Sequence, residues 1–201
     1  MNRDGLRNEI VNYVGERRLP HVLGTERECL ALASLFGLSD EETEKLAAAA
    51  LLHDITKGFT TAEHIEFMES RGRSIDEKNL RSDKTLHALT GAFMARELYP
   101  ELTDDTVFSA ILFHTTGKED MSLTQKLMYL ADYIEPTRSF DDCIKLRNYF
   151  YGNIESGSKL KVLNDTLILS FDMTIENLIK QRNPIHPDTI AARNYLISRE
   201  D

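Results

Sequence analysis

The sequence predicts an all-α protein that folds as a single domain. Apolar residues recur at every third or fourth position in nearly every segment, which is the spacing of amphipathic helices. No run shows the apolar and polar alternation of a half-buried strand, and no polar linker or internal repeat divides the chain. A chain of 201 residues is long enough to bury one core without covalent cross-links.

Start and stop signals place the first helices in order. Pro20 is expected to end the first helix and Gly37 the second, because proline interrupts a helix and glycine is common after its last turn. Ser39 and Glu42 have the spacing of a capping box, which opens the helix that leads to residue 54. Gly58 ends this third segment. The three helices are expected at 6–20, 21–37 and 39–54.

The later helices follow from the same signals. A charged peripheral helix is expected to leave His64 in solvent. His87 starts a helix that ends before Pro100, and Ser122 starts one that Pro136 ends. These helices are expected at 61–69, 87–98, 103–114, 122–134, 160–180 and 189–197, with residues 136–201 packed on a core formed by 1–135.

Composition argues against several classes of protein. The net charge is −9 and the pI is near 5.2, so no broad basic surface is expected for nucleic acid or an anionic membrane. No segment approaches the roughly 18 apolar residues of a membrane span, and the first residues lack the apolar stretch of a signal peptide. Cys29 and Cys143 read as two reduced thiols. We therefore expect a cytoplasmic protein with no nucleic-acid partner and no membrane partner.

Six polar residues at helix ends or within apolar stripes are the candidate functional group. In AAAALLHDITK, an apolar run leads straight into His53 and Asp54, and Asp132 lies within LMYLADYI. A carboxylate in such a stripe is costly to bury unless a cation or hydrogen bonds satisfy it. Singly, each residue is more often a helix cap or a hydrogen-bonded core residue, but one shared metal site explains all of them. The group is His21, His53, Asp54, His87, His114 and Asp132.

The donor types indicate the kind of metal. Imidazole together with carboxylate suits Fe, Mn, Co or Zn better than Mg or Ca, which prefer oxygen ligands. Asp54 has two oxygens that could bridge two ions, and six ligands exceed the need of one ion that keeps a water. Two interpretations stay open: a binuclear centre, or one ion with His87 and His114 directed at substrate. His186 could line the rim of a pocket, and Lys57 could contact a phosphate or simply be solvated.

The order of these residues resembles the HD superfamily of metal-dependent phosphohydrolases. The segments GERRLPH, ALLHDITK, FHTTGKEDMSLTQKLMYLADYIEPTRSF and RNPIHPDT are similar to the bacterial YqeK family, over essentially the whole chain. Members of that family are symmetrical diadenosine tetraphosphate hydrolases, which cut the tetraphosphate in the middle and release two ADP. The resemblance implies one helical HD domain over 1–201, with iron as the first expectation for the metal and Mn, Co or Zn as alternatives.

The resemblance also implies roles for individual residues. The expected metal ligands are His21, His53, Asp54 and Asp132, with His87 and His114 as ligands of a second ion or as phosphate contacts. Metal-bound hydroxide is expected to attack an inner phosphorus, with catalytic roles for Asp54, His87 and His114. The expected substrate contacts are Arg18, Lys57, His87, His114, Thr115, Arg138, Arg182, Pro184 and Ile185. The partners are then the nucleotide substrate and the ADP product, and a homodimer is compatible with the sequence.

Two alternatives to this activity stay open. The chain could be another HD nucleotide phosphohydrolase, such as a nucleotide monophosphatase or a cyclic-nucleotide esterase. It could also be a nucleotide-binding sensor without hydrolysis, although the complete ligand set argues against this. A covalent route is not expected, because neither cysteine neighbours a candidate base and no GxSxG motif occurs.

Overall fold

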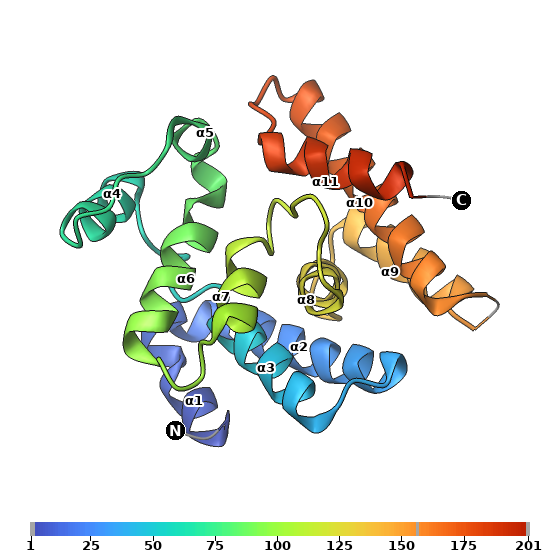
Figure 1. Cartoon of the computed structure of the whole chain (residues 1–201), viewed down its shortest axis with the longest axis horizontal. Coiled ribbons are helices and arrows are strands. Elements are labelled where there is room, and N and C mark those ends of the chain that lie inside the picture. Colours follow the sequence, from blue (N-terminus) through green and yellow to red (C-terminus); the bar gives the residue numbers. More distant parts are fainter. Residues whose placement is uncertain (1–2, 156, 200–201) are drawn as a thin grey trace.

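The computed structural model of the chain describes residues 3–155 and 157–199, and within these ranges it contains helices and no strand (Figure 1). The predicted all-α fold is therefore confirmed. The helices are α1 Arg3–Glu9, α2 Val11–Phe36, α3 Asp40–Leu52, α4 Thr61–Glu69, α5 Glu77–Leu80, the 3-10 helix η1 Asp83–Thr85, α6 Leu86–Leu98, α7 Asp105–Leu112, α8 Leu123–Ile134, α9 Asp141–Asn153, α10 Lys159–Lys180 and α11 Pro187–Ile197. None of them combines the length and apolar character needed to cross a bilayer.

Capping boxes start several of these helices. The Ser39 side chain accepts a hydrogen bond from the backbone N–H of Glu42, whose carboxylate accepts one from the backbone N–H of Ser39. Ser122 and Gln125 form the same arrangement at the start of α8. Each box satisfies two N–H groups that the first turn leaves without helical partners. The predicted starts of α3 and α8 are confirmed.

The sequence predicts a helix break at Pro20, but the chain leaves helical geometry at Gly15 instead. Gly15 adopts φ 72° and ψ 161°, outside the helical region, and it interrupts α2. Pro20 lies within the segment that restarts after Gly15, where it removes only one helical hydrogen bond. As a result, Arg18 and His21 lie three residues apart on one continuous stretch of helix and share a face.

Helix α3 lies at the centre of the packing of the first eight helices. It contacts α2, α6, α7 and α8. Its last two turns are fully or almost fully buried and contain four consecutive alanines, Ala47–Ala50. Small side chains allow neighbouring helices to approach closely on several sides. The C-terminal end of α3, which carries His53 and Asp54, is therefore surrounded by other helices.

The last three helices pack on α8 and on one another. α9 and α10 contact α8, and α10 also contacts α11. Figure 1 shows α9–α11 together on one side of the molecule, with α8 seen end-on between them and the earlier helices. No bounds for α9 were expected from the sequence; it buries Cys143, Leu146 and Phe150.

A candidate metal centre

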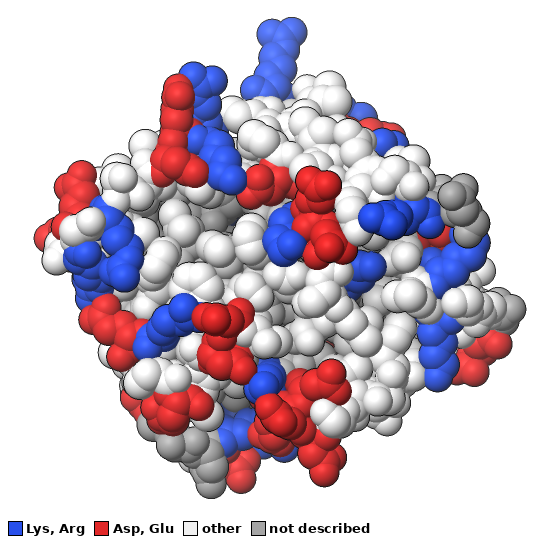
Figure 2. All heavy atoms as spheres, in the orientation of Figure 1, with Lys and Arg blue, Asp and Glu red and all other residues white. Residues whose placement is uncertain are grey.

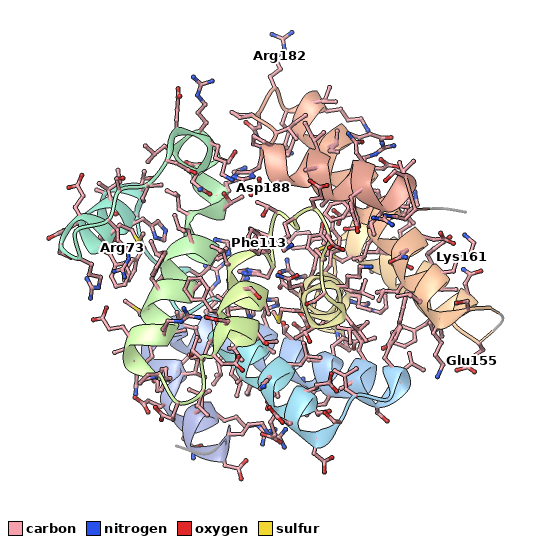
Figure 3. The ribbon with its side chains drawn as sticks, viewed as in Figure 1. Arg73, Phe113, Glu155, Lys161, Arg182 and Asp188 are labelled. Atoms are coloured by element: carbon pink, nitrogen blue, oxygen red, sulfur yellow. The ribbon has the colours of Figure 1, made fainter. Side chains whose placement is uncertain are left out.

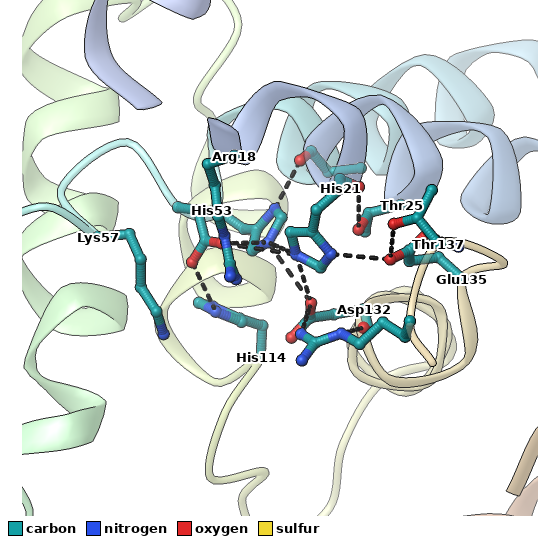
Figure 4. A network of polar contacts seen from close by, with 12 residues as sticks. Arg18, His21, Thr25, His53, Lys57, His114, Asp132, Glu135 and Thr137 are labelled. Carbon is teal, nitrogen blue, oxygen red and sulfur yellow. Dashed lines mark hydrogen bonds and ion pairs between the residues drawn. The ribbon is translucent and has the colours of Figure 1, made fainter. Parts of the chain in front are cut away.

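The six candidate ligands converge on one buried cluster, although they come from five different segments. Figure 4 labels four of them, His21, His53, His114 and Asp132. His21 lies on α2, His53 and Asp54 follow α3, and Asp132 lies near the end of α8. The other two are His87 in the first turn of α6 and His114 in the loop after α7. Five are buried, and the Asp132 side chain is 14% exposed. The structure therefore brings together every residue that the sequence singled out for a shared site.

Asp54 lies between two groups of imidazoles. Its Oδ2 atom is 3.2 Å from His53 Nε2 and 3.5 Å from His21 Nε2. Its Oδ1 atom is 3.3 Å from His87 Nε2 and 4.0 Å from His114 Nε2. Oδ1 is buried and has no hydrogen-bond partner. An unpaired carboxylate oxygen is costly in a protein interior. A cation or a hydrogen-bond donor beside this atom would therefore stabilise the folded protein.

The imidazoles present their Nε2 atoms to the cluster. His53 Nδ1 lies 2.6 Å from the carbonyl oxygen of Ala50, and His114 Nδ1 lies 2.7 Å from that of Ile111. A carbonyl only accepts hydrogen bonds, so Nδ1 carries the proton in both rings and the Nε2 lone pair is free. His53 Nε2 is 3.3 Å from His21 Nε2. These nitrogens are thus oriented as metal ligands usually are.

The surroundings keep the carboxylates charged and two of the histidines neutral. Burial alone would raise the pKa of Asp132, but the Arg138 guanidinium and the hydrogen bond from His21 hold this pKa well below its usual range. Burial lowers the pKa of His87 well below its ordinary value and that of His114 to about 4. Ionised carboxylates and neutral imidazoles are the protonation states that bind a metal.

His21 behaves differently in the absence of a metal. Its burial would lower its pKa, but hydrogen bonds to Asp132, Asp54 and Glu135 outweigh the burial and raise the pKa to about 10. Several carboxylates around one imidazole amount to an excess of negative charge. The donor set of imidazoles and carboxylates, with the unpaired Asp54 oxygen, therefore fits a transition-metal ion.

Three cationic side chains surround the cluster. Arg18 Nε donates to Asp54 Oδ2 over 2.6 Å, and Arg138 Nη2 donates to Asp132 Oδ1 over 2.6 Å. Lys57 Nζ lies 3.0 Å from His87 Nε2. Elsewhere, on the face seen in Figure 2, acidic and basic side chains are interspersed and form no broad basic patch. The positive charge expected for binding an anion is therefore present beside this cluster.

A cavity of about 180 Å³ lies between the segment that contains η1 and the pair α10 and α11. Thr115, the residue after His114, lines it, and its hydroxyl oxygen is buried without a partner. Pro184 also lines this cavity, whereas Ile185 lines a neighbouring hollow. Arg182 extends away from the rest of the molecule (Figure 3). The cavity is thus lined by the residue that directly follows the candidate ligand His114 in the chain.

His186 closes one side of this cavity. It lines the cavity wall, and its Nδ1 accepts a hydrogen bond from the backbone N–H of Asp188 at the start of α11. Its Nε2 lies 3.3 Å from Asn79 Oδ1, and Lys78 Nζ lies 3.0 Å from Asp188 Oδ2. These two contacts join α5 to α11 beside the cavity.

Two residues behind the site were not identified from the sequence. His64, which was expected in solvent, is buried, and its Nδ1 lies 2.7 Å from the hydroxyl of Thr90. Glu135 is fully buried and contacts His21 Nδ1 over 3.0 Å. The glutamates of α4 make the helix look peripheral, and Glu135 before Pro136 looks like an ordinary helix end. No sequence spacing links either residue to its partner.

Comparison with known proteins agrees with this geometry. Residues 18–137 match the HD domain family. The chain is 34% identical to a symmetrical bis(5'-nucleosyl)-tetraphosphatase of Halalkalibacterium halodurans, over 98% of both chains. It is 29% identical to the protein of the same name from Bacillus subtilis, over 98% of this chain and 99% of the other.

A solved structure shows the same fold. The crystal structure of an HD superfamily hydrolase from Clostridium acetobutylicum, described as involved in NAD metabolism, has a TM-score of 0.86 and 36% identity to this chain. The match covers 100% of this chain and 99% of that one. The chain therefore belongs to the HD domain family and, through its full-length identity to curated relatives, to the symmetrical bis(5'-nucleosyl)-tetraphosphatases.

Proposed function

We propose that this chain hydrolyses diadenosine tetraphosphate at the central phosphoanhydride bond and releases two ADP. The full-length identity to symmetrical tetraphosphatases supports this reaction. The observation that carries it is the position of Asp54, whose two oxygens each face a different group of imidazoles. Such an arrangement suits hydrolysis of a phosphoanhydride, because two sites on either side of one carboxylate can hold positive charge against the phosphates.

The proposal includes an assignment of ligands. His21, His53 and Asp132, with Asp54 Oδ2, would hold one ion, and His87 and His114, with Asp54 Oδ1, would hold a second. Iron is the metal we expect, with Mn, Co or Zn as alternatives. A transition metal in such a site supplies a water nucleophile that ionises near neutral pH, together with positive charge next to the phosphate oxygens.

The cationic side chains would bind and orient the phosphates. Arg18 and Arg138 carry planar guanidinium groups that can hold two phosphate oxygens at once, and both lie beside the ligand cluster. Lys57 can place a third positive charge beside His87. Fixing the tetraphosphate chain on both sides of its central bond aligns that bond for attack.

His87 and His114 fit the role of ligands better than the role of proton donors. Burial keeps both imidazoles neutral near pH 7, because it lowers the pKa of each. ADP is a good leaving group and needs no strong acid to depart. Asp54 would act by helping to hold the positive charge that faces the phosphates.

The cavity beside Thr115 would receive one nucleoside half of the substrate. Its lining combines apolar atoms with an unpaired hydroxyl, as in many nucleoside sites. Pro184 would contact the nucleoside directly, and Ile185 would support the same loop. We assign no role to Arg182, since its side chain extends away from this cavity.

Product identification tests the reaction. Protein purified without chelators is incubated with diadenosine tetraphosphate and a divalent metal, and the nucleotides are separated by ion-exchange chromatography. We expect ADP alone. Formation of AMP and ATP would refute the central cut. Faster cleavage of a nucleoside monophosphate or a cyclic nucleotide, assayed in parallel, would favour another HD phosphohydrolase.

Variants test the site. Asp54→Ala should lose nearly all hydrolysis together with bound metal, because it removes the carboxylate shared by both groups of histidines. Asp141→Ala, at an exposed position in the first turn of α9, is the matched control and should leave both quantities unchanged. Full metal content and turnover in Asp54→Ala would show that the site is misassigned. Metal binding without turnover in the wild-type protein would favour a nucleotide sensor.

A further inference from the structure

A buried carboxylate orients His21, whereas main-chain carbonyl groups orient His53 and His114. Glu135 has no exposed surface, and its Oε1 atom lies 3.0 Å from His21 Nδ1. On the opposite edge of the ring, His21 Nε2 lies 3.0 Å from Asp132 Oδ1. Figure 4 shows these contacts on the two sides of the imidazole. His21 thus lies between the ligand cluster and the Glu135 carboxylate, to which the proposed function assigns no role.

The Glu135 carboxylate is held in place by its own loop. The backbone N–H of Thr137 donates to Oε2 over 2.7 Å, and the Thr137 hydroxyl donates to Oε1 over 2.6 Å. Arg147 on α9 holds the same loop by donating to the carbonyl oxygens of Glu135 and Arg138, over 2.7 and 2.9 Å. Both carboxylate oxygens therefore have fixed partners, and the side chain has no freedom to turn away from His21.

Helix α2 leaves room for this carboxylate at one glycine. A Cβ atom on Gly24 would lie 2.3 Å from Glu135 Oε2 and 3.0 Å from its Cδ. Real contacts of a Cβ are never this close, so an alanine at position 24 would displace the carboxylate. Gly24 follows His21 by three residues and lies on the same face of α2. The helix that carries His21 thus also contains the space for the group that orients it.

We propose that Glu135 is a positioning residue that keeps His21 ready to bind the metal. Because a carboxylate only accepts, Glu135 holds a proton on His21 Nδ1, so that Nε2, which faces Asp132 and His53, is the nitrogen left to bind the metal. Carboxylate groups behind a ligating histidine typically change metal affinity by about 10–100-fold. This inference rests on the metal site of the proposed function, but it does not depend on which nucleotide is hydrolysed.

Glutamine at position 135 should reverse the orientation of the proton on His21. The Thr137 backbone N–H only donates, so the amide oxygen of glutamine must take the place of Oε2. The amide NH₂ then takes the place of Oε1 and donates to His21 Nδ1. The His21 proton moves to Nε2, where it blocks the ligand position. Glu135→Gln, although nearly isosteric, should therefore weaken metal binding as much as Glu135→Ala or more.

Cobalt titration of metal-free protein measures this effect without any nucleotide. The visible absorption of bound Co²⁺ gives the affinity of the wild type and of each variant, and thermal unfolding of the metal-free proteins gives their stability. We expect Glu135→Gln to bind Co²⁺ at least about tenfold more weakly than the wild type. Gly24→Ala should also weaken binding, although it leaves the carboxylate chemically intact.

The matched control is Glu28→Gln. Glu28, on α2, is another buried carboxylate. It accepts a hydrogen bond from the Tyr151 hydroxyl and is not among the side-chain partners of His21, which are Glu135, His53, Asp54 and Asp132. We expect its Co²⁺ affinity to stay within about twofold of the wild type, since it changes the same charge without changing the imidazole. A purely structural role for Glu135 predicts the opposite order, with Glu135→Ala impaired and Glu135→Gln nearly normal. That order would overturn the proposal.

Nitrogen NMR of the zinc-loaded wild-type protein provides a test that needs no variant. We expect the His21 proton on Nδ1, and a proton on Nε2 would refute the role of Glu135. If wild-type protein binds Co²⁺ as described but does not cleave diadenosine tetraphosphate, the proposed reaction fails while this inference stands. If it cleaves the substrate and Glu135→Gln keeps full Co²⁺ affinity, the inference fails while the proposed reaction stands.

Discussion

Gly117 closes the loop that carries His114, and replacing it with alanine should destabilise the protein by two separate effects. Its φ angle is +64°, in the left-handed region that residues with a Cβ rarely adopt. A Cβ atom at this position would also lie 2.7 Å from Phe171 Cζ and 3.1 Å from Ala192 Cβ. Phe171 and Ala192 are fully buried on α10 and α11, so neither can move aside without disturbing the core.

The two effects can be estimated separately. The left-handed conformation costs about 1 kcal/mol for a residue with a Cβ. Forcing a methyl group into a packed core costs about 1–3 kcal/mol more. Gly117→Ala should therefore lower the free energy of unfolding by about 2–4 kcal/mol. For a chain of this size, the melting temperature should fall by roughly 5–15 °C.

Gly37→Ala is the control that measures the cost of the left-handed backbone conformation without a steric overlap of the added Cβ. Gly37 has nearly the same φ angle, +68°, but a Cβ there would meet no atom within 4 Å. Urea unfolding of both variants, in metal-free form, gives the two free-energy changes. We expect about 1 kcal/mol for Gly37→Ala, from the left-handed conformation alone. Equal losses in the two variants would refute the contact with Phe171 and with it the described path of the loop after His114.

Two further predictions concern residues near the site. Burial lowers the pKa of His64, so its neutral form contributes stability that is present above about pH 6.5 and is lost as the pH falls through the lowered pKa. His64→Gln should therefore flatten the decrease in melting temperature between about pH 7 and 5, and an unchanged slope would contradict this. Thr115→Val removes the unpaired hydroxyl of the cavity and should raise KM about fivefold with little change in kcat, a loss of about 1 kcal/mol of binding. A wild-type KM would exclude Thr115 from the nucleoside site.

Local signals predicted most of the helix bounds, but competing local signals could not be ranked. Ser39 and Ser122 are caps whose hydrogen bonds involve only neighbouring residues, so their helices begin as predicted. Pro20 and Gly15 are both helix breakers, and only the structure shows that the chain turns at Gly15. The difference matters for the site, because it places Arg18 and His21 on the same helix.

Helix α9 had no clear bounds in the sequence because its apolar residues do not form a single stripe. Leu146 and Phe150 are buried, but Ile144 and Tyr151 on the same helix are apolar and exposed. An observer of the sequence cannot know which of the two sets faces the core. The homodimer and the cytoplasmic location expected from the sequence stay predictions.

The ligand cluster could be predicted as a set because the six residues share one anomaly, a polar group beside an apolar run. Their arrangement around Asp54 could not, since it depends on how five segments meet. The contact between Glu135 and His21 could not be predicted from the sequence either. His21 is 114 residues away from Glu135, and the position of Glu135 before a proline has an ordinary explanation. A residue that orients a metal ligand can be identified only when the position of that ligand in the fold is known.

The charges around Asp54 explain how an acidic protein can accept a tetraphosphate. Arg18 and Arg138 are each paired with a carboxylate of the cluster, so a phosphate must compete with Asp54 and Asp132 for them. A cation held by these carboxylates would remove that competition, because the same oxygens would then be neutralised. Affinity for the anionic substrate should therefore depend on the metal more than on the net charge of −9. The arginines and the ligands thus form one electrostatic unit, and we expect that neither group binds the substrate tightly without the other.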